Sequence, residues 1–193
     1  MIADFIEFCY RLFPSIDPYT KEQAKLCMKQ FENVNGALLT SRYNEAEDLT
    51  QGDIFSEIPF FYIDNNGQQK MIRRKAQLLS NTCDAVRDNT LIFAALHPID
   101  EFTSNKSMIE GIKQNHRYSA LYLPDNPISD EFVDLEMINT ISREAFISFL
   151  EMGKVRRVAS LTQVGYYMFL CKLTVFFMRP EDVEVNSSRP IGD

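Results

Sequence analysis

The stretch Ala76-Gln77-Leu78-Leu79-Ser80-Asn81-Thr82-Cys83-Asp84 carries the chain from an apolar segment into a run of polar side chains. A second apolar segment, Thr90–Leu96, follows after Arg87-Asp88-Asn89. Domains rich in β-structure commonly present functional side chains on a polar loop held between rigid strands. The pattern therefore predicts strands over 76–80 and 90–96, joined by a structured loop that presents a site.

Further apolar segments on both sides of this stretch predict additional short strands. They are expected over 53–55, 60–63, 69–72, 117–123, 132–135, 137–141 and 155–158. Asn66-Gly67 lies between two of them and is a strong hairpin signal, because both residues tolerate a positive φ. Residues 37–50 are expected to form a connection.

Helical spacing marks both ends of the chain. A first helix is expected to stop at Pro14, and a second to run from about Thr20 to the stop signal Asn35-Gly36. Their apolar faces consist of Ile2, Phe5, Ile6, Cys9 and Phe13 in the first helix, and Ala24, Cys27, Met28 and Phe31 in the second. Shorter helices are expected over 100–114 and 143–150.

The last helix is expected to begin at the capping box Ser160-x-x-Gln163 and to end at Arg179-Pro180. Its buried stripe is expected to consist of Leu161, Val164, Met168, Cys171 and Val175. Met168 and Cys171 are expected to be fully buried against the sheet.

These elements predict an α+β fold: an SH3-like barrel or a strongly bent antiparallel sheet, with N-terminal helices and a long C-terminal helix. Residues 1–36 are expected to form a helical extension. Residues 50–185 would form the barrel with its packed helix, and residues 186–193 a flexible tail.

Charge and composition limit the partners and the cellular location that we expect. The chain of 193 residues is 45% apolar and carries a net charge of −7, which disfavours RNA as a partner without excluding it. Four scattered cysteines and an acidic start without a basic leader indicate a cytoplasmic protein with free thiols. The apolar run 164–178 is too short to span a bilayer. We therefore expect another protein as the partner and no membrane, and we leave the oligomeric state open.

Three segments carry a resemblance to a known family through their sequence and their order along the chain. They are Gly52-Asp53-Ile54-Phe55, Arg74-Lys75-Ala76-Gln77-Leu78-Leu79-Ser80-Asn81 and Leu96-His97-Pro98-Ile99. In this order they resemble the MazF/PemK-type toxins of the SH3-like barrel superfamily, which have a Gly-Asp-Ile/Val strand, an Arg-Pro-x-x-x-Ile/Leu-Ser-Asn run and a strand ending in a Pro-Ile-Thr-like sequence. The resemblance implies the fold, a setting in a bacterial or phage conflict system, and an endoribonuclease as one candidate activity.

The chain departs from that family where the chemistry lies. In the family's ribonucleases an arginine beside the proline and a later Thr or Ser carry RNA cleavage. Arg74 matches the arginine, but Lys75 replaces the proline and Asp100 stands at the Thr/Ser position. A carboxylate at that point repels a phosphate. The first hypothesis is therefore a non-enzymatic binding or regulatory protein, and the alternative is an endoribonuclease that uses Arg74 and Asp100.

The candidate binding residues are Arg74, Ser80, Asn81, Thr82, Cys83, Asp84, Arg87 and His97. They are expected to form a polar pocket at one rim, floored by Leu79 and Phe93, with Arg74 or Arg87 near Asp84.

Three other interpretations of these residues remain open. Cys83 could act as a nucleophile with His97 or His116 as its base, or be a half-buried structural thiol. The cations could bind a phosphate or carboxylate, or, as we favour, Asp84, Asp88 and Asp100 could pair with the arginines. Arg156-Arg157 is expected to be a solvated edge.

Metal and cofactor signals are weak. A magnesium site at Asp84 with Asp88 or Asp100 lacks a compact carboxylate cluster, and no nucleotide-binding or hydrolase motif occurs. No cofactor and no metal are expected.

Overall fold

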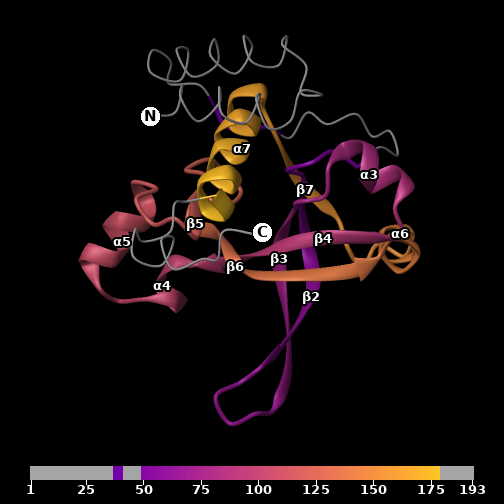
Figure 1. Ribbon diagram of the computed structural model, residues 1–193, viewed down its shortest axis with the longest axis horizontal. Coiled ribbons are helices and arrows are strands. Elements are labelled where there is room, and N and C mark those ends of the chain that lie inside the picture. The colour runs from indigo at the N-terminus through magenta and orange to yellow at the C-terminus, as the bar shows by residue number, and fades with distance from the viewer. Residues whose placement is uncertain (1–36, 41–48, 179–193) are drawn as a thin grey trace, which may run out of the picture.

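The computed structural model describes residues 37–40 and 49–178, and these contain one antiparallel sheet of seven strands flanked by helices (Figure 1). The strand order is β1-β7-β2-β3-β4-β6-β5. The strands are β1 (Leu39–Thr40), β2 (Ile54–Ile63), β3 (Gln69–Leu78), β4 (Thr90–Pro98), β5 (Ala120–Tyr122), β6 (Glu131–Ser142) and β7 (Arg157–Leu161). The predicted α+β class with a bent antiparallel sheet is confirmed. Within the described residues the sheet is open, with β1 and β5 at its edges.

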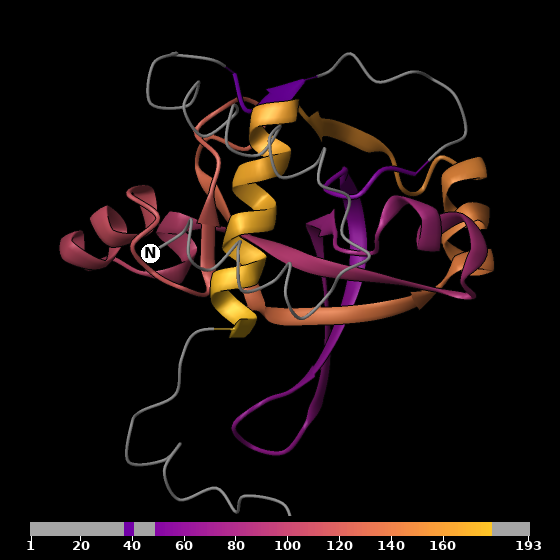
Figure 2. The same cartoon turned by 45° about the horizontal axis from the view of Figure 1, so that its top comes forward.

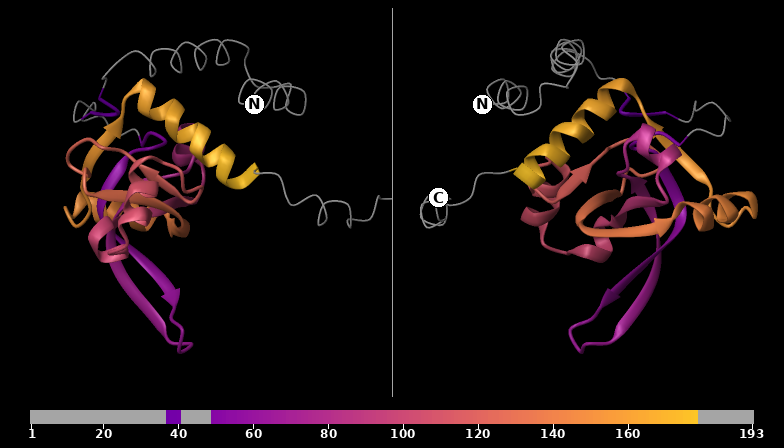
Figure 3. Two further views of the ribbon diagram at one scale, coloured as in Figure 1. Left: turned by 90° about the vertical axis from the view of Figure 1, so that its left-hand side faces the viewer. Right: turned by 45° about the vertical axis from the view of Figure 1, so that its right-hand side comes forward.

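The hairpin of β2 and β3 follows from its turn. The Asp64 carboxylate accepts hydrogen bonds from the Asn66 and Gln68 backbone N–H groups, both at 2.9 Å, and Gly67 has a φ of 75°. Both strands are longer than predicted. The segments 53–55 and 60–63 belong to one strand with a bulge after Phe55, and the predicted strand 69–72 continues without interruption to Leu78, which includes the start of the predicted strand 76–80. Beyond the sheet they continue as a twisted ribbon that projects from the body (Figure 3).

Among the described residues, helices lie between consecutive strands at three places, and one helix follows the last strand. They are α3 (Thr82–Arg87), α4 (Ile99–Phe102), α5 (Lys106–Lys113), α6 (Arg143–Glu151) and α7 (Gln163–Met178). The expected helices over 100–114 and 143–150 are therefore present, the first as two pieces. The predicted strands 132–135 and 137–141 are one strand, β6, with a bulge where Ala94 pairs with Ile138 and Ala95 with Asp134.

Each face of the sheet has its own apolar core. On one face the rings of Phe55, Phe93 and Phe146 meet with centroids 5.0 to 6.1 Å apart, and Phe146 brings α6 onto the sheet. On the other face α7 packs across the sheet (Figure 2), with Phe169 fully buried among Leu96, Leu121 and neighbouring aliphatic side chains. A third, smaller cluster around Ile112 and Phe132 holds α5 on β5 and β6.

The C-terminal helix begins later and is rotated relative to the prediction. Ser160 lies in β7 and donates a hydrogen bond to Asp53, whereas Thr162 Oγ1 accepts the Gly165 N–H at 3.2 Å and caps the helix. Phe169 and Gly165 occupy the buried side. Met168 and Cys171 are only half-buried, so the prediction that both are fully buried is wrong. Gly165 faces the Leu38 carbonyl so closely that a Cβ at this position would lie 2.1 Å from its oxygen.

Several predictions fall outside the described residues. They concern the helices over residues 1–36 with Cys9 and Cys27, the tail 186–193 and the end of the last helix at Arg179-Pro180. In the part of the chain that is described, no helix has the length and apolar character needed to cross a bilayer.

Candidate functional site

The polar segment after β3 folds into a helix whose side chains serve its own backbone. The Asn81 side chain accepts the Cys83 N–H at 3.0 Å and caps α3, and Arg87 Nε donates to the Cys83 carbonyl at 3.1 Å. Ser80 is buried and its hydroxyl accepts the Ile92 N–H at 2.9 Å. Thr82 Oγ1 accepts the Gln51 N–H. These contacts brace the segment, as expected for residue types that favour caps and turns.

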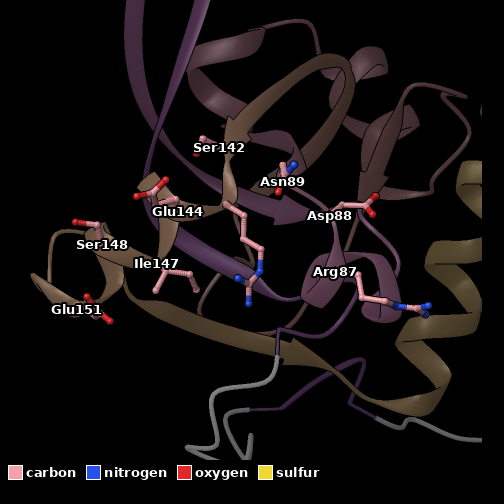
Figure 4. Close-up of a pocket in the computed structure, with 9 residues that line it drawn as sticks. Arg87, Asp88, Asn89, Ser142, Glu144, Ile147, Ser148 and Glu151 are labelled. Carbon is pink, nitrogen blue, oxygen red and sulfur yellow. The ribbon is translucent and has the colours of Figure 1, made fainter.

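A cavity of about 560 Å³ lies where α3 ends and α6 begins (Figure 4). Of the predicted site residues, only Arg87 lines it. Its other lining residues are Asp88, Asn89, Ser142, Arg143, Glu144, Ile147, Ser148 and Glu151. Arg143 is held by the structure, since its Nε donates to the Ala85 carbonyl at 2.9 Å. Carboxylates thus outnumber cations on the lining, which does not favour an anionic ligand.

A second group of charged residues gathers at the other end of β3 and β4. Ala76 pairs with Ala95, and Arg74 and His97 lie two residues beyond this pair on the same face of the sheet. Arg74 forms an ion pair with Glu101 of α4 at 2.7 Å. Its Nε is buried and, among the described residues, has no hydrogen-bond partner. Arg74, His97 and Glu101, together with Asp134 of β6, which lies 3.6 Å from His97, are called the Arg74 cluster below.

His97 is held in a largely apolar setting. Its ring stacks on Phe132 at a centroid distance of 5.9 Å, and its Nε2 lies 3.3 Å from the sulfur of Met137 and 3.6 Å from Asp134. Burial, aided by the Arg74 charge, lowers the pKa of His97 against the opposing effect of Asp134. Burial likewise raises the pKa of Asp134. The cluster therefore favours a neutral imidazole beside an arginine.

Aromatic rings border the Arg74 cluster. The Phe102 ring meets Phe132 edge to face with centroids 4.9 Å apart, and the Arg117 guanidinium lies over Phe102 at 5.8 Å. The positive charge of Arg117 also acts on Asp134 and partly opposes the rise in the pKa of that carboxyl group. Sequence reasoning missed Glu101, Phe102, Asp134 and Phe132, because they come from separate elements that only the sheet register brings together.

The predicted single pocket is not formed. Arg74 and His97 lie together, whereas Ser80–Asp84 and Arg87 lie at the other end of the strands. His97 is four residues along β4 from Phe93, the partner of Leu78, which corresponds to about 13 Å at ~3.3 Å per residue. Cys83 is exposed on α3, so the structure does not bring it to His97 as a nucleophile would require.

The ion pairs in the structure also differ from those expected. Arg74 pairs with Glu101 instead of Asp100, whose carboxylate is exposed and accepts the Glu101 N–H at 2.9 Å. Arg157, predicted to be solvated, pairs with the buried Asp53 at 3.2 Å and lies over the Phe55 ring.

Asp84 and Asp88 are exposed around α3. Within residues 37–40 and 49–178, no group of three or more His, Cys, Asp or Glu side chains is arranged to hold a metal.

An apolar stripe lies on the projecting hairpin. Phe61 pairs directly with Met71, and Ile63 follows on the same side of β2. These side chains are 54%, 52% and 74% exposed, respectively. Phe61, Ile63 and Met71 are called the hairpin stripe below. Contiguous exposed apolar side chains of this kind mark interaction surfaces.

A likeness to known proteins appears among solved structures. No family model matches the chain, and no curated protein matches it. Among solved structures, it resembles a chain in the crystal structure of MazE-MazF (form II) from Deinococcus radiodurans. The TM-score is 0.40 at 10% sequence identity, over 69% of this chain and 99% of that chain.

Proposed function

We propose that the protein is a non-enzymatic binding or regulatory protein that engages a partner protein through its hairpin stripe. The observation that carries this proposal is the exposure of Phe61, Ile63 and Met71, each more than half exposed, on one side of a ribbon that projects from the body. Burying these side chains against a partner removes apolar surface from water, at about 25 cal/mol per Å².

The charges of the hairpin favour an acidic partner. Lys70, Arg73, Arg74 and Lys75 outnumber Glu57 and Asp64 on the ribbon, in a chain whose net charge is −7. Arg74 pairs with Glu101, Lys75 with Glu131 at 2.6 Å and Lys70 with Asp64 at 3.7 Å. The Arg73 guanidinium donates to the Glu57 carbonyl at 3.0 Å and keeps its charge near the stripe. A partner strand that alternates apolar and acidic side chains would match both features.

The backbone of the hairpin offers a docking edge. Among the described residues, β3 pairs with β4 only over Ala76–Leu78, so the edge of its first part is not covered by another strand. An extended partner segment can add to such an edge through main-chain hydrogen bonds, while side-chain contacts supply specificity. The hairpin therefore combines an apolar stripe, a positive charge and an open strand edge.

The Arg74 cluster supports a non-enzymatic role. A phosphate that approached Arg74 would have to displace Glu101, and Asp134 lies near His97 on the same face. The resemblance of residues 52–55, 74–81 and 96–99 to the MazF/PemK-type toxins supports a cytoplasmic role in a bacterial or phage conflict system.

One observation favours a second candidate, an endoribonuclease. The buried Nε of Arg74 lacks an acceptor among the described residues, and it lies beside an imidazole whose neutral form is favoured. A neutral imidazole can accept the proton of a ribose 2′-hydroxyl, and an arginine can stabilise the charge that develops on the phosphate.

Photo-crosslinking in living cells tests the proposal. A benzoylphenylalanine placed at Phe61 should form an adduct with another protein, and the same group at Met152, 61% exposed at the end of α6, should not. Adding Met71→Glu places a carboxylate opposite Phe61 and should abolish the adduct, whereas Met152→Glu should leave it unchanged.

The alternatives give different outcomes. An adduct with RNA, an adduct with a second copy of this chain, or no adduct would overturn the proposal. In parallel, the purified protein should leave single-stranded RNA intact. Cleavage by the wild type that is lost in Arg74→Ala would instead establish the endoribonuclease.

A further inference from the structure

The main-chain groups of the projecting ribbon divide into two sets, one that joins β2 to β3 and one that points away from the ribbon. At the turn, the Asp64 N–H donates to the Gln68 carbonyl at 2.9 Å, so these two residues form a bonded pair. In an antiparallel ladder, bonded pairs alternate with pairs whose N–H and C=O groups point outward. The register therefore makes Tyr62 and Lys70 the next bonded pair. The outward-pointing pairs of the ribbon are Ile63 with Gln69, Phe61 with Met71 and Pro59 with Arg73.

Pro59 fits this assignment independently of the turn. A proline has no N–H, so within a ladder it is tolerated at a position whose N–H would point outward. The Pro59 carbonyl also points away from β3, because it accepts a hydrogen bond from Asn139 Nδ2 of β6 at 3.3 Å. Both observations place Pro59 among the outward-pointing residues, in agreement with the count from Asp64 and Gln68.

The outer edge of β2 is partly blocked. At Pro59 this edge offers no N–H, and the carbonyl is already used. The Glu57 carbonyl accepts the Arg73 guanidinium at 3.0 Å. A proline at an edge is one of the devices that keep a further strand from pairing there. Among the described residues of the ribbon, this leaves Phe61 and Ile63 as the β2 residues that present both outward groups.

The outer edge of β3 is open over a longer stretch. Gln69, Met71 and Arg73 point outward in succession, and each has both an N–H and a carbonyl. Among the described residues, β4 pairs with β3 only over Ala76–Leu78, so no described strand covers this edge. Residues 69–73 extend over about 16 Å at ~3.3 Å per residue. This part of the ribbon projects clear of the body of the protein (Figure 3).

We propose that the partner binds as an added strand on β3, hydrogen-bonded to the main chain of Gln69, Met71 and Arg73, and that it leaves the edge of β2 free. The inference rests on the proposed function and specifies its interface. Side chains directly opposite each other in a sheet share one face. An apolar partner side chain opposite Met71 therefore lies over the hairpin stripe, and its main chain pairs with the strand that carries Arg73.

Charge favours an acidic segment at this edge. Arg73 is exposed, and its hydrogen bond to the Glu57 carbonyl holds the guanidinium without neutralising it. Among the described residues, the neighbouring cations Lys70, Arg74 and Lys75 each have a carboxylate partner, whereas Arg73 has none. A partner carboxylate beside Arg73 would therefore add an ion pair without displacing one, which favours this side of the ribbon for an acidic partner.

Amide hydrogen exchange, resolved by NMR, tests the edge in the free protein. The outward N–H groups of Gln69, Met71 and Arg73 should exchange rapidly, because they can do so without local unfolding. The inward N–H groups of Lys70 and Ile72 should exchange at least ten-fold more slowly. Equal protection of both sets would show that the β3 edge is already occupied and would overturn the inference, whatever the partner is.

The same measurement on the complex decides which edge the partner uses. The complex is the adduct captured through benzoylphenylalanine in place of Phe61. In it, exchange of the outward N–H groups of β3 should slow at least ten-fold, whereas the N–H of Ile63, on the outer edge of β2, should exchange as in the free protein. An adduct that protects Ile63 instead, or protects neither edge, would overturn the inference and leave the proposed function standing. The absence of any adduct would overturn both.

A pair of proline substitutions tests the same edge in living cells. Gln69 and Ile63 lie directly opposite each other, and proline at either position removes one outward N–H. Gln69→Pro should lower the adduct yield at least five-fold relative to Gln69→Ala. Ile63→Pro and Ile63→Ala should give yields within two-fold of each other. Equal yields from the two variants at Gln69, or a loss specific to Ile63→Pro, would overturn the inference.

Discussion

The guanidinium of Arg74 meets the carboxylate of Glu101 at 2.7 Å, so the cation that resembles a catalytic arginine already has an anionic partner within the chain. Arg74 comes from β3 and Glu101 from α4, the short helix that continues directly from β4. The pair therefore depends on where β4 ends, and it determines how strongly this part of the surface attracts a phosphate.

Removing the negative charge of Glu101 should strengthen RNA binding. We expect Glu101→Gln to bind a short single-stranded RNA about two- to five-fold more tightly than the wild type at low salt. This range corresponds to about 0.4–1 kcal/mol, the upper part of the contribution typical of an exposed ion pair. Fluorescence anisotropy measures the change. Glu144→Gln, which removes an equal charge from α6, should have less effect, and Arg74→Ala should cancel the gain of Glu101→Gln. Equal gains from both glutamate variants would show that only net charge matters.

The two described cysteines should differ in reactivity. Cys83 is exposed on α3, whereas Cys171 is half-buried on α7 and burial raises the pKa of its thiol. Because the thiolate is the reactive form, iodoacetamide should alkylate Cys83 faster than Cys171 at pH 7.5. Peptide mass spectrometry over time gives both rates. Cys83→Ser should remove the fast phase and leave the rate of Cys171 unchanged. Equal rates would contradict the placement of Cys83.

Lys172 should make the protein more stable as the pH rises above 8. Burial lowers its pKa from 10.5 to about 8. Between these two values the unfolded chain binds more protons than the folded chain, so the free energy of unfolding increases with pH. Below pH 8 both states are protonated and this dependence disappears.

Urea denaturation at pH 8, 9 and 10 tests the effect of Lys172. The difference in unfolding free energy between the wild type and Lys172→Met should shift in favour of the wild type as the pH rises. Lys113→Met, which removes an exposed lysine from α5, serves as the control and should give a flatter difference. A flat difference for Lys172→Met would mean that Lys172 does not lose its proton in this range.

Gly165→Ala should destabilise the protein, whereas Gly111→Ala should not. A Cβ at Gly165 would lie 2.1 Å from the Leu38 carbonyl oxygen, so α7 or residues 37–40 would have to move. Forced shifts of this kind typically cost about 1–3 kcal/mol. At Gly111, inside α5, a Cβ would meet nothing within 4 Å and should stabilise the helix by about 0.5–1 kcal/mol. Chemical denaturation of both variants measures whether each substitution lowers or raises the free energy of unfolding.

The elements whose signals are local were predicted well. Asn66-Gly67 predicted the hairpin, and Gly67 takes the positive φ that the turn requires. The strand 90–96 and the helix 143–150 were found within two residues of their ends. The segment between β3 and β4 was predicted to be a structured loop, but the helix within it, Thr82–Arg87, was missed, because six residues give too short a periodic signal.

The candidate site was predicted less well, because its contacts join residues that are far apart in the sequence. Arg74 and His97 were identified from the sequence and lie together, but Glu101 and Asp134, the carboxylates that oppose them, were not. Asp134 is 37 positions from His97 and meets it only because a bulge in β6 sets Asp134 opposite Ala95. Such contacts depend on the register between strands, which no local pattern encodes.

By itself, the sequence determined the class of the fold, the turn of the hairpin and the order of most elements, because turn residues, helix caps and apolar periodicity act over a few neighbouring positions. The tertiary structure alone decided which side of α7 is buried, which carboxylate meets Arg74, and that Phe61, Ile63 and Met71 stay exposed. These outcomes depend on close packing between distant segments, as where the missing Cβ of Gly165 lets α7 rest on the Leu38 carbonyl.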